Sequence, residues 1–456
     1  MFENKTIAAI ATAQAAGGIG VIRVSGENAT QICDKVFKSL SGKKLSGSLG
    51  YRAHFGRVSD GENDIDECVA LVFKAPHSYT GEDVVELSCH GGLYLLKKVL
   101  RLVLNSGAKP ASAGEFTQRA FLNGRIDLTQ AQAVMDLINA HAEQSASAAL
   151  STLDGVLSKE VNNVCSVLVS ASATLSAWVD YPDDEIEELS SESLTDELRK
   201  AQKMLTKLIN TYDTGKTITQ GVNVAIVGKP NVGKSTLMNL LSGVQKSIVS
   251  EYAGTTRDAV EETVMLGGIV LHLTDTAGIR SSDDPIESIG VELAKQKLER
   301  ATLVFAVFDS SEKLDEEDIE LLEKCQNKIC IAIINKCDLE NKCDKSLIRK
   351  YIENVVEISA KEGNGKDNLS QTVTKVLGTD KIDTSSAMLM DERQFYCTNE
   401  ALKCVEEAIN ALKIGMTLDA VNVTIDSAIE FLQTLTGQKA SESVVNEIFS
   451  KFCVGK

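Results

Sequence analysis

Hydrophobic and polar positions alternate in short runs from residue 6 to about residue 120. Three runs are rich in residues that favour β-strands: "GVIRVSG" (20–26), "CVALVFKAP" (68–76) and "VVELSCH" (84–90). Two further stretches, 27–40 and 92–105, have helical spacing. The pattern predicts a mixed α+β domain in this part of the chain.

The next stretch, from about residue 122 to 214, almost lacks Gly and Pro and repeats Ala, Leu, Val and Ser at helical spacing, which predicts long helices. The same composition and helical spacing occur again after residue 379. Between about 221 and 377, predicted strands and helices alternate, as in a parallel α/β sheet. We therefore expect a helical domain made of two chain segments, with the α/β unit inserted between them.

Composition places limits on the partners. The chain of 456 residues is too long for one core, and its net charge of −17 disfavours bulk binding to nucleic acid or anionic lipid. Any RNA contact is then local or shared with a basic partner. An odd count of 11 cysteines without a CxxC pair fits reduced thiols better than disulfides or zinc. No basic leader or apolar run of about 18 residues occurs, so we expect a soluble intracellular protein.

The α/β stretch contains a phosphate-binding pattern. A β-run leads into Gly228-x-x-x-x-Gly233-Lys234-Ser235, which opens an amphipathic helix. A P-loop needs this order, because backbone N–H groups and the helix N-terminus converge on the phosphates. Lys234 would reach the β- and γ-phosphates, and the Ser235 hydroxyl would bind Mg²⁺.

Four further motifs follow in the order of a GTP-binding domain. "GTTRD" (254–258) supplies Thr256 as a second Mg²⁺ ligand, and "LTDTAG" (273–278) supplies Asp275 for the metal's water shell. In "IINKCD" (333–338), Asp338 can accept from guanine and Asn335 can bond its N7, and "ISAKEG" (358–363) lies beside the base. The predicted GTP-binding residues are Asn231, Val232, Gly233, Lys234, Ser235, Thr236, Ser250, Glu251, Tyr252, Ala253, Gly254, Thr255, Thr256, Asp275, Thr276, Ala277, Gly278, Asn335, Lys336, Asp338, Ser359, Ala360 and Lys361.

The sequence alone leaves the hydrolysis mechanism open. Ile279 stands where Ras-like GTPases have the glutamine that orients water. Arg257 and Arg280 are nearby in sequence, and either is a candidate arginine finger. Alternatively, the amide of Asn231 would hold a monovalent cation that acts as an arginine finger does. Glu287 would polarise the water, or it is a surface glutamate at a helix start.

The sequence resembles one family over almost its whole length. "GKPNVGKST", "GTTRD" and "DTAG" resemble the bacterial GTPases that include Era, EngA and MnmE. The flanking motifs "TGEDVVELSCHGG" (80–92), "GEFTQRAFLNGRIDLTQAQAVMDLI" (114–138) and "IFSKFCVGK" (448–456) resemble MnmE (TrmE), the tRNA uridine-5-carboxymethylaminomethyl modification GTPases.

The resemblance implies an α/β multidomain architecture. The expected parts are an N-terminal α+β tetrahydrofolate-binding and dimerisation domain (1–119), a discontinuous all-helical domain (120–215 and 379–456), and an inserted Ras-like P-loop GTPase domain with a mostly parallel sheet (216–378). It also implies that K⁺ drives dimerisation of the GTPase domains and activates hydrolysis. The implied K⁺ ligands are Asn231, Ser250, Thr255 and the backbone of Tyr252, and Glu287 becomes the water-orienting residue.

The resemblance further implies a folate pocket and a set of partners. The pocket residues are Arg23, Glu86, Arg125 and Lys456, and the ligand is 5,10-methylenetetrahydrofolate or 5-formyltetrahydrofolate. Arg125 stands where at least some members have a lysine, so a planar guanidinium with several fixed donors replaces a compact ammonium group. The implied partners are a second copy of the chain, the FAD-dependent protein MnmG (GidA) in a heterotetramer or larger complex, and tRNA, in the cytoplasm and without a membrane.

Cys453, four residues from the end in "CVGK", has three possible uses. A prenylation box would anchor it to a membrane, but Gly455 and Lys456 fit that motif poorly and no polybasic stretch precedes it. As a thiolate beside folate it would add to C6 of uracil and make C5 enamine-like. Otherwise it is a packing residue.

We predict the catalytic use of Cys453, in a GTPase that modifies wobble uridine. The alternative function is a GTP-driven assembly or RNA-remodelling factor without chemistry on RNA.

Overall fold

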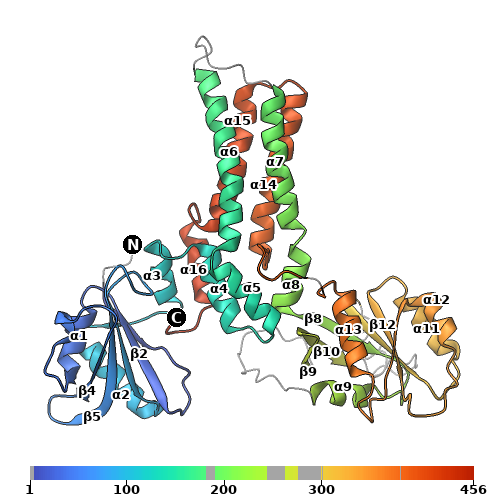
Figure 1. Ribbon diagram of the computed structural model, residues 1–456, viewed down its shortest axis with the longest axis horizontal. Helices are drawn as coiled ribbons and strands as arrows, with labels where there is room; N and C mark the ends of the chain where they lie inside the picture. Colours follow the sequence, from blue (N-terminus) through green and yellow to red (C-terminus); the bar gives the residue numbers. More distant parts are fainter. Residues whose placement is uncertain (1–4, 181–190, 244–261, 276–298, 300, 381) are drawn as a thin grey trace, which may run out of the picture. The chain divides into compact units, whose positions relative to one another are not determined.

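The computed structural model describes residues 5–180, 191–243, 262–275, 299, 301–380 and 382–456 (Figure 1). The chain forms two compact units. The first comprises Met1–Met135, Val161–Glu188 and Asn410–Lys456, and the second comprises Asp136–Glu160 and Leu189–Ile409. No helix in the described ranges has the length and apolar character of a membrane span.

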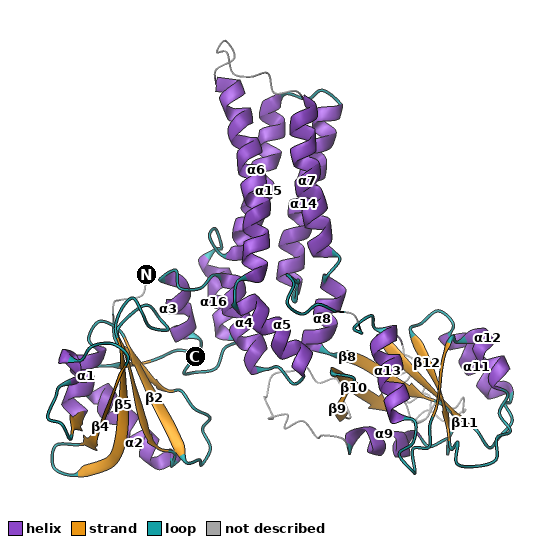
Figure 2. Ribbon diagram, in the orientation of Figure 1, coloured by secondary structure: helices purple, strands orange, loops and turns teal. Residues whose placement is uncertain are grey.

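The first unit contains a sheet, drawn in orange with β2, β4 and β5 labelled in Figure 2. Its described strands, seven in number, run in the order β3-β4-β5-β6-β2-β1-β7. Neighbours are antiparallel except β1 and β7, which are parallel. The strands are β1 (Ile7–Ile10), β2 (Ile19–Ser25), β3 (Phe37–Ser39), β4 (Arg52–Ser59), β5 (Asp64–Phe73), β6 (Val84–His90) and β7 (Lys109–Pro110).

Two helices, α1 (Ala29–Val36) and α2 (Leu93–Asn105), pack together on one face of this sheet. Ile22 and Val24 of β2 are fully buried in that core. Because successive side chains of a strand point to opposite faces, Arg23 lies on the other face. Arg23, a residue of the predicted folate pocket, therefore lies on the face of the sheet opposite α1 and α2.

The rest of the first unit is helical. It contains α3 (Glu115–Leu122), most of α4 (Leu128–Ile138), most of α6 (Val156–Asp180), α15 (Leu418–Thr436) and α16 (Glu442–Ser450). The α16 residues Val445 and Phe449 pack against the start of α4 in one apolar cluster. The Ser172 hydroxyl of α6 donates to Asp426 of α15 over 2.8 Å.

The second unit contains a sheet with six described strands in the order β13-β12-β11-β8-β10-β9. All neighbours are parallel except the β9–β10 pair. The strands are β8 (Val222–Val227), β9 (Glu262–Leu266), β10 (Ile269–Asp275), β11 (Leu303–Asp309), β12 (Cys330–Asn335) and β13 (Asn354–Glu357).

Helices cover both faces of this second sheet. Helices α9 (Lys234–Ser242) and α13 (Lys366–Val376) share one apolar cluster with the strands, and α11 (Glu316–Cys325) and α12 (Lys345–Tyr351) share the other. The central strands are therefore apolar at nearly every position. The unit also contains α5 (Glu143–Leu153), α7 (Ser191–Ile209), α8 (Tyr212–Gln220) and most of α14 (Glu392–Lys413).

The prediction of a mixed α/β protein is confirmed, but the predicted helix over 27–40 is wrong at its last four positions. The helix ends at Val36, and Phe37–Ser39 form strand β3. Phe37 pairs with Val58 of β4, so sheet pairing with a distant strand overrides local helical spacing. The domain boundaries given above stay predictions.

Asp136, in the last turn of α4, makes stability depend on pH. Burial, and then the nearby Asp391 carboxylate, raise the pKa of Asp136 to about 7. Because an unfolded aspartate titrates near pH 4, the stabilisation is complete below about pH 4 and is lost as the pH rises through about 7. We expect Asp136→Asn, which cannot ionise, to stabilise the chain more at about pH 8 than at about pH 5.

Urea unfolding at the two pH values measures this difference. Asp196→Asn is the control, because the Asp196 side chain is 76% exposed. A gain that is the same at both pH values would contradict the raised pKa of Asp136.

Candidate functional site

The predicted nucleotide-binding motifs follow the carboxyl ends of parallel strands in the second sheet. The P-loop follows β8, Asn335 ends β12, and residues 359–361 follow β13. Asp275 ends β10, where it pairs in parallel with Ile226 of β8. Since the carboxyl ends of parallel strands meet at one edge of a sheet, these motifs gather at the place where α/β sheets bind ligands.

The P-loop is shaped by its backbone and by Lys234. Asn231 has φ of 66° and Gly233 has φ of 98°, both in the left-handed region, and Gly233 is the N-cap residue directly before helix α9. The Lys234 ammonium donates to the carbonyl oxygens of Gly228 (2.7 Å) and Lys229 (2.8 Å). Ser235 and Thr236 are exposed in the first turn of α9, where backbone N–H groups have no partner within the helix.

Asn335 joins the P-loop to the loop at residues 359–361. Its side-chain amide donates to the Val232 carbonyl over 2.9 Å, and its Oδ1 accepts from the Ala360 N–H over 3.0 Å. Asn335 is only 2% exposed, so both bonds are shielded from water. The sequence predicts that Asn335 bonds N7 of guanine; the geometry gives it a joining role as well.

Asp338 is held as an ionised carboxylate. Its Oδ1 accepts from the buried Ser359 hydroxyl over 2.6 Å, and this bond, with smaller contributions, lowers the pKa of Asp338. The remaining acceptor capacity of such a carboxylate suits the adjacent N1–H and amine donors of guanine. Lys336, with φ of 61°, shapes the same loop by pairing with Asp309. Burial acts to raise the pKa of Asp309, but Lys336 and Ser311 together lower it.

Part of the predicted nucleotide and cation site lies outside the described residues. These residues are Ser250, Glu251, Tyr252, Ala253, Gly254, Thr255, Thr256, Thr276, Ala277, Gly278 and Glu287. Asp275 is described only as the last residue of β10. Of the predicted metal ligands, Asn231 and Ser235 lie in the described part of the chain.

The first unit brings predicted folate residues together on the face of its sheet opposite α1 and α2. Arg23 of β2 pairs across the strands with Glu86 of β6, and their side chains form an ion pair with Nε–Oε1 of 2.8 Å. The side chains are 16% and 20% exposed. The Arg23 guanidinium also lies over the rings of Tyr79 and Phe116, 5.4 and 5.6 Å from their centroids.

The C-terminal residues 453–456 dock beside this pair. Arg23 donates to the Gly455 carbonyl over 3.3 Å, and the Phe116 N–H donates to the main-chain oxygen of Lys456 over 3.2 Å. Gly455 has φ of 100°, and a Cβ there would meet the Ile10 carbonyl oxygen at 2.4 Å, so glycine is required. Cys453, which is partly buried, accepts through its carbonyl from the Gly114 N–H.

Of the four predicted folate residues, Arg23, Glu86 and Lys456 therefore gather in one place. The fourth, Arg125, is exposed, and its stem passes close to Gly81 in the turn that carries Tyr79.

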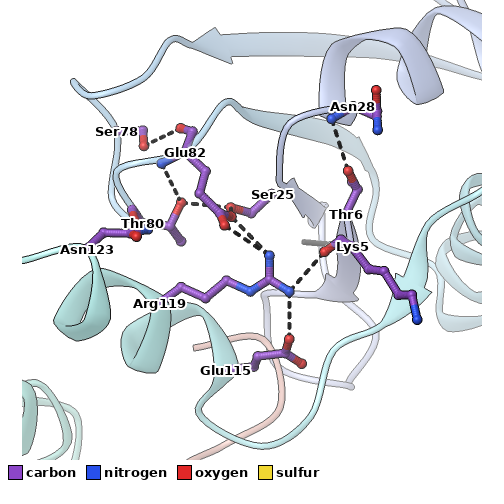
Figure 3. A network of polar contacts seen from close by, with 10 residues as sticks. All are labelled: Lys5, Thr6, Ser25, Asn28, Ser78, Thr80, Glu82, Glu115, Arg119 and Asn123. Atoms are coloured by element: carbon purple, nitrogen blue, oxygen red, sulfur yellow. Dashed lines mark hydrogen bonds and ion pairs between the residues drawn. The ribbon is translucent and has the colours of Figure 1, made fainter. Parts of the chain in front are cut away.

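A buried polar network holds α3 in position (Figure 3). Arg119 donates to both carboxylate oxygens of Glu82 at 3.1 Å, to Glu115 at 2.8 Å and to the Lys5 carbonyl at 2.9 Å. Arg119 and Glu115 are 6% and 5% exposed. Because Phe116 precedes Arg119 by less than one helical turn, this network also fixes the ring that faces Arg23.

Sequence reasoning missed Tyr79, Phe116 and Arg119 as parts of this site. Phe116 and Arg119 lie within the motif 114–138, and Tyr79 directly precedes the motif 80–92. That position was the only signal, since their contacts depend on how α3 sits on the sheet. The motifs 80–92 and 114–138 contact each other through Glu82 and Arg119, and 114–138 contacts the terminal motif through Phe116.

Comparison with known proteins finds relatives along the whole chain. A family model described as the MnmE helical domain matches residues 128–453, and one described as the GTP-binding protein TrmE N-terminus matches residues 6–125. The protein named tRNA modification GTPase MnmE of Clostridioides difficile (strain 630) is 40% identical over 459 residues, 100% of each chain. The protein of that name from Alkaliphilus metalliredigens (strain QYMF) is 40% identical over 461 residues, also 100% of each.

Among solved structures, an Era variant from Aquifex aeolicus bound to GDP·AlF4⁻ is 32% identical. The match covers 40% of this chain and 66% of that one, with a TM-score of 0.29. The G domain of the T. maritima FeoB iron transporter is 29% identical over 34% of this chain and 98% of that one, with a TM-score of 0.27.

Proposed function

This chain belongs to the MnmE family of tRNA modification GTPases, and from that premise we propose that it modifies the wobble uridine of certain tRNAs. With an FAD-dependent partner, it adds a carboxymethylaminomethyl group to C5 of that base. GTP hydrolysis in the second unit drives the conformational step, and a folate carried by the first unit supplies one carbon. The observation that supports the GTP site is the meeting of four motifs at one sheet edge.

The P-loop binds the phosphates of GTP, and the loops at residues 335–338 and 359–361, here called the base loops, bind its guanine base. Lys234 and the N-terminus of α9 bind the phosphates, because the backbone N–H groups there point toward an anion. Asp338 selects guanine, since its carboxylate can only accept and adenine presents a donor–acceptor pattern that does not fit. Asn335 keeps the two loops in register through its bonds to Val232 and Ala360.

The hydroxyl and amide oxygens of the P-loop suit Mg²⁺ and K⁺. Ser235, exposed beside Lys234, is a hard oxygen ligand of the kind Mg²⁺ prefers, and Thr256 is its proposed companion. Asn231, exposed in its left-handed conformation, offers an amide oxygen for K⁺, together with Ser250, Tyr252 and Thr255. When bound, K⁺ supplies positive charge where the transition state builds negative charge. Glu287 orients the attacking water.

The Arg23–Glu86 pair is the proposed folate anchor. A half-buried guanidinium and carboxylate side by side offer donors and acceptors to a polar heterocycle, and Tyr79 and Phe116 flank them with apolar rings. Lys456 and Arg125 complete the pocket. Bound 5,10-methylenetetrahydrofolate or 5-formyltetrahydrofolate supplies the one-carbon unit.

Cys453 is the proposed nucleophile toward uracil. Its thiolate adds to C6, which makes C5 nucleophilic, and C5 then forms a bond to the methylene carbon of 5,10-methylenetetrahydrofolate as one bond of that carbon to a folate nitrogen breaks. Loss of the C5 proton and elimination of the thiolate then restore the C5–C6 double bond. The docking of residues 453–456 beside Arg23 supports this role by bringing Cys453 into the same part of the first unit.

The proposed assembly is a homodimer that works with MnmG in a heterotetramer or larger complex in the cytoplasm. The net charge of −17 indicates that the partner makes much of the tRNA contact. Filter binding of tRNA to the isolated chain examines this point, and submicromolar binding would contradict it.

GTP hydrolysis in K⁺ and in Na⁺ tests the catalytic part of the proposal. We expect wild-type turnover to be at least about tenfold faster in K⁺, because only K⁺ fits the proposed ligand set. Glu287→Ala is expected to slow hydrolysis in K⁺ by about 10²–10³-fold and to leave GTP binding within about twofold, because water activation is lost while the nucleotide contacts remain.

Equal turnover of the wild type in the two salts would remove Asn231 from the mechanism. Unchanged turnover of the Glu287→Ala variant would remove Glu287.

A further inference from the structure

Lys229, a P-loop residue outside the predicted GTP-binding set, is tied to helix α11. Its ammonium lies 2.6 Å from Asp315 Oδ2 and 2.8 Å from Asp318 Oδ2. The Lys229 and Asp318 side chains are 16% and 5% exposed, whereas Asp315 is 57% exposed. The contact is thus a partly shielded ion triad rather than an isolated surface pair.

The two aspartates also cap the start of α11, and this restricts the positions of their carboxylates. Asp315 Oδ1 accepts from the Asp318 N–H over 3.1 Å, and Asp318 Oδ2 accepts from the Asp315 N–H over 3.2 Å. This reciprocal capping box satisfies helix donors and restricts both carboxylates. Helix α11 is anchored in turn, because Leu322 and Cys325 are buried against the sheet. Lys229 is therefore held by a rigid partner.

The backbone of Lys229 transmits this restraint to Lys234. The carbonyl oxygens of Gly228 and Lys229 accept from the Lys234 ammonium at 2.7 and 2.8 Å. A shift of residue 229 moves one of these two acceptors. We propose that Lys229 is a positioning residue for the nucleotide: its ion pairs with α11 fix the P-loop carbonyl that orients Lys234 toward the phosphates. This inference rests on the proposed role of residues 228–235 in holding phosphate.

The test compares nucleotide affinity and turnover in the full chain. Lys229→Met keeps the apolar stem but removes the charge. We expect its Kd for a fluorescent GDP analogue to rise about fivefold, with kcat for GTP hydrolysis within about twofold, because an ion pair of this exposure is modest and acts on binding. Asp315→Asn/Asp318→Asn, which keeps side chains able to cap the helix, is expected to give a similar rise.

Combining the three substitutions distinguishes this mechanism from a general loss of structure. If Lys229 acts through the two aspartates, the triple variant is no weaker than either parent within about twofold. Additive losses would contradict the mechanism, as would an unchanged Kd in Lys229→Met. Lys324→Met is the matched control: it breaks an ion pair of 2.6 Å with Glu320 in the same helix, and we expect no change in Kd.

Lys234→Ala separates this inference from the proposed function. If that variant binds the GDP analogue as tightly as the wild type, the P-loop assignment itself fails. If Lys234→Ala weakens binding and Lys229→Met does not, the P-loop assignment stands and the role of Lys229 is rejected.

Discussion

Substitution of Gly233 by alanine is expected to weaken GTP binding by about 30-fold or more. A Cβ at this position would lie 2.2 Å from Asn335 Nδ2, and the backbone φ of 98° is unfavourable for alanine. The left-handed conformation costs about 1–2 kcal/mol, and expelling the buried Asn335 amide from its two bonds costs about 1–3 kcal/mol more. Each 1.4 kcal/mol is about tenfold in affinity.

Either way of relieving the collision damages the site. If the P-loop keeps its shape, Asn335 leaves Val232 and Ala360, and the base loops lose their register with the phosphates. If Asn335 stays, the loop before α9 changes conformation, and Lys234 loses its position. Competition between GTP and a fluorescent GDP analogue measures the affinity.

Gly378→Ala is the control for backbone strain. Gly378 has φ of 67°, but no atom lies within 4 Å of the Cβ position, so the substitution adds strain without a collision. We expect it to leave GTP affinity within about twofold. Tight GTP binding by a folded Gly233→Ala variant would contradict the joining role of Asn335.

The second large effect is expected in the first unit, where Arg23→Met should lower affinity for 5-formyltetrahydrofolate by about tenfold or more. The substitution leaves the half-buried Glu86 carboxylate without its guanidinium and removes the donor to the Gly455 carbonyl. Hydrogen bonds to charged groups contribute about 1.5–3 kcal/mol, which corresponds to this range. Isothermal titration calorimetry on the full chain measures the affinity.

Hydrogen exchange at residues 453–456 gives an independent measure of the same change. We expect faster exchange there in Arg23→Met, because the tail loses an anchor. Arg57→Met is the matched control, since Arg57 is paired with Asp64 (3.0 Å) and Glu67 (2.8 Å) on the same sheet but is 48% exposed. Unchanged folate affinity in Arg23→Met, with the control also unchanged, would remove Arg23 from the pocket.

How far the sequence predicts the fold depends on whether a feature is local. The P-loop is local: its glycines, Lys234 and Ser235 follow a strand and open a helix within a few residues. The strands of the second sheet were readable because burial on both faces makes them continuously apolar. The end of the helix at Val36 was not, since strand β3 forms only through pairing with β4.

The same distinction holds for the two candidate sites. Asn335 is 103 positions from Val232, and nothing local indicates that its amide bonds the P-loop. Arg23 and Glu86 were predicted through a family resemblance rather than through strand register, which places them as direct cross-strand partners. The Arg119 network and the ring of Phe116 depend on the seating of α3, so only their place within a motif pointed to them.

The most direct test of the account is nucleoside mass spectrometry of tRNA from cells that lack this chain, complemented with wild type, Gly233→Ala or Cys453→Ser. We expect the C5-modified wobble uridines to disappear without the chain and to return with wild type alone. Return of the modification with Cys453→Ser would remove the proposed nucleophile and leave the modification role intact. Unchanged nucleosides in cells without the chain would contradict the proposed modification of wobble uridine and favour an assembly factor that does no chemistry on RNA.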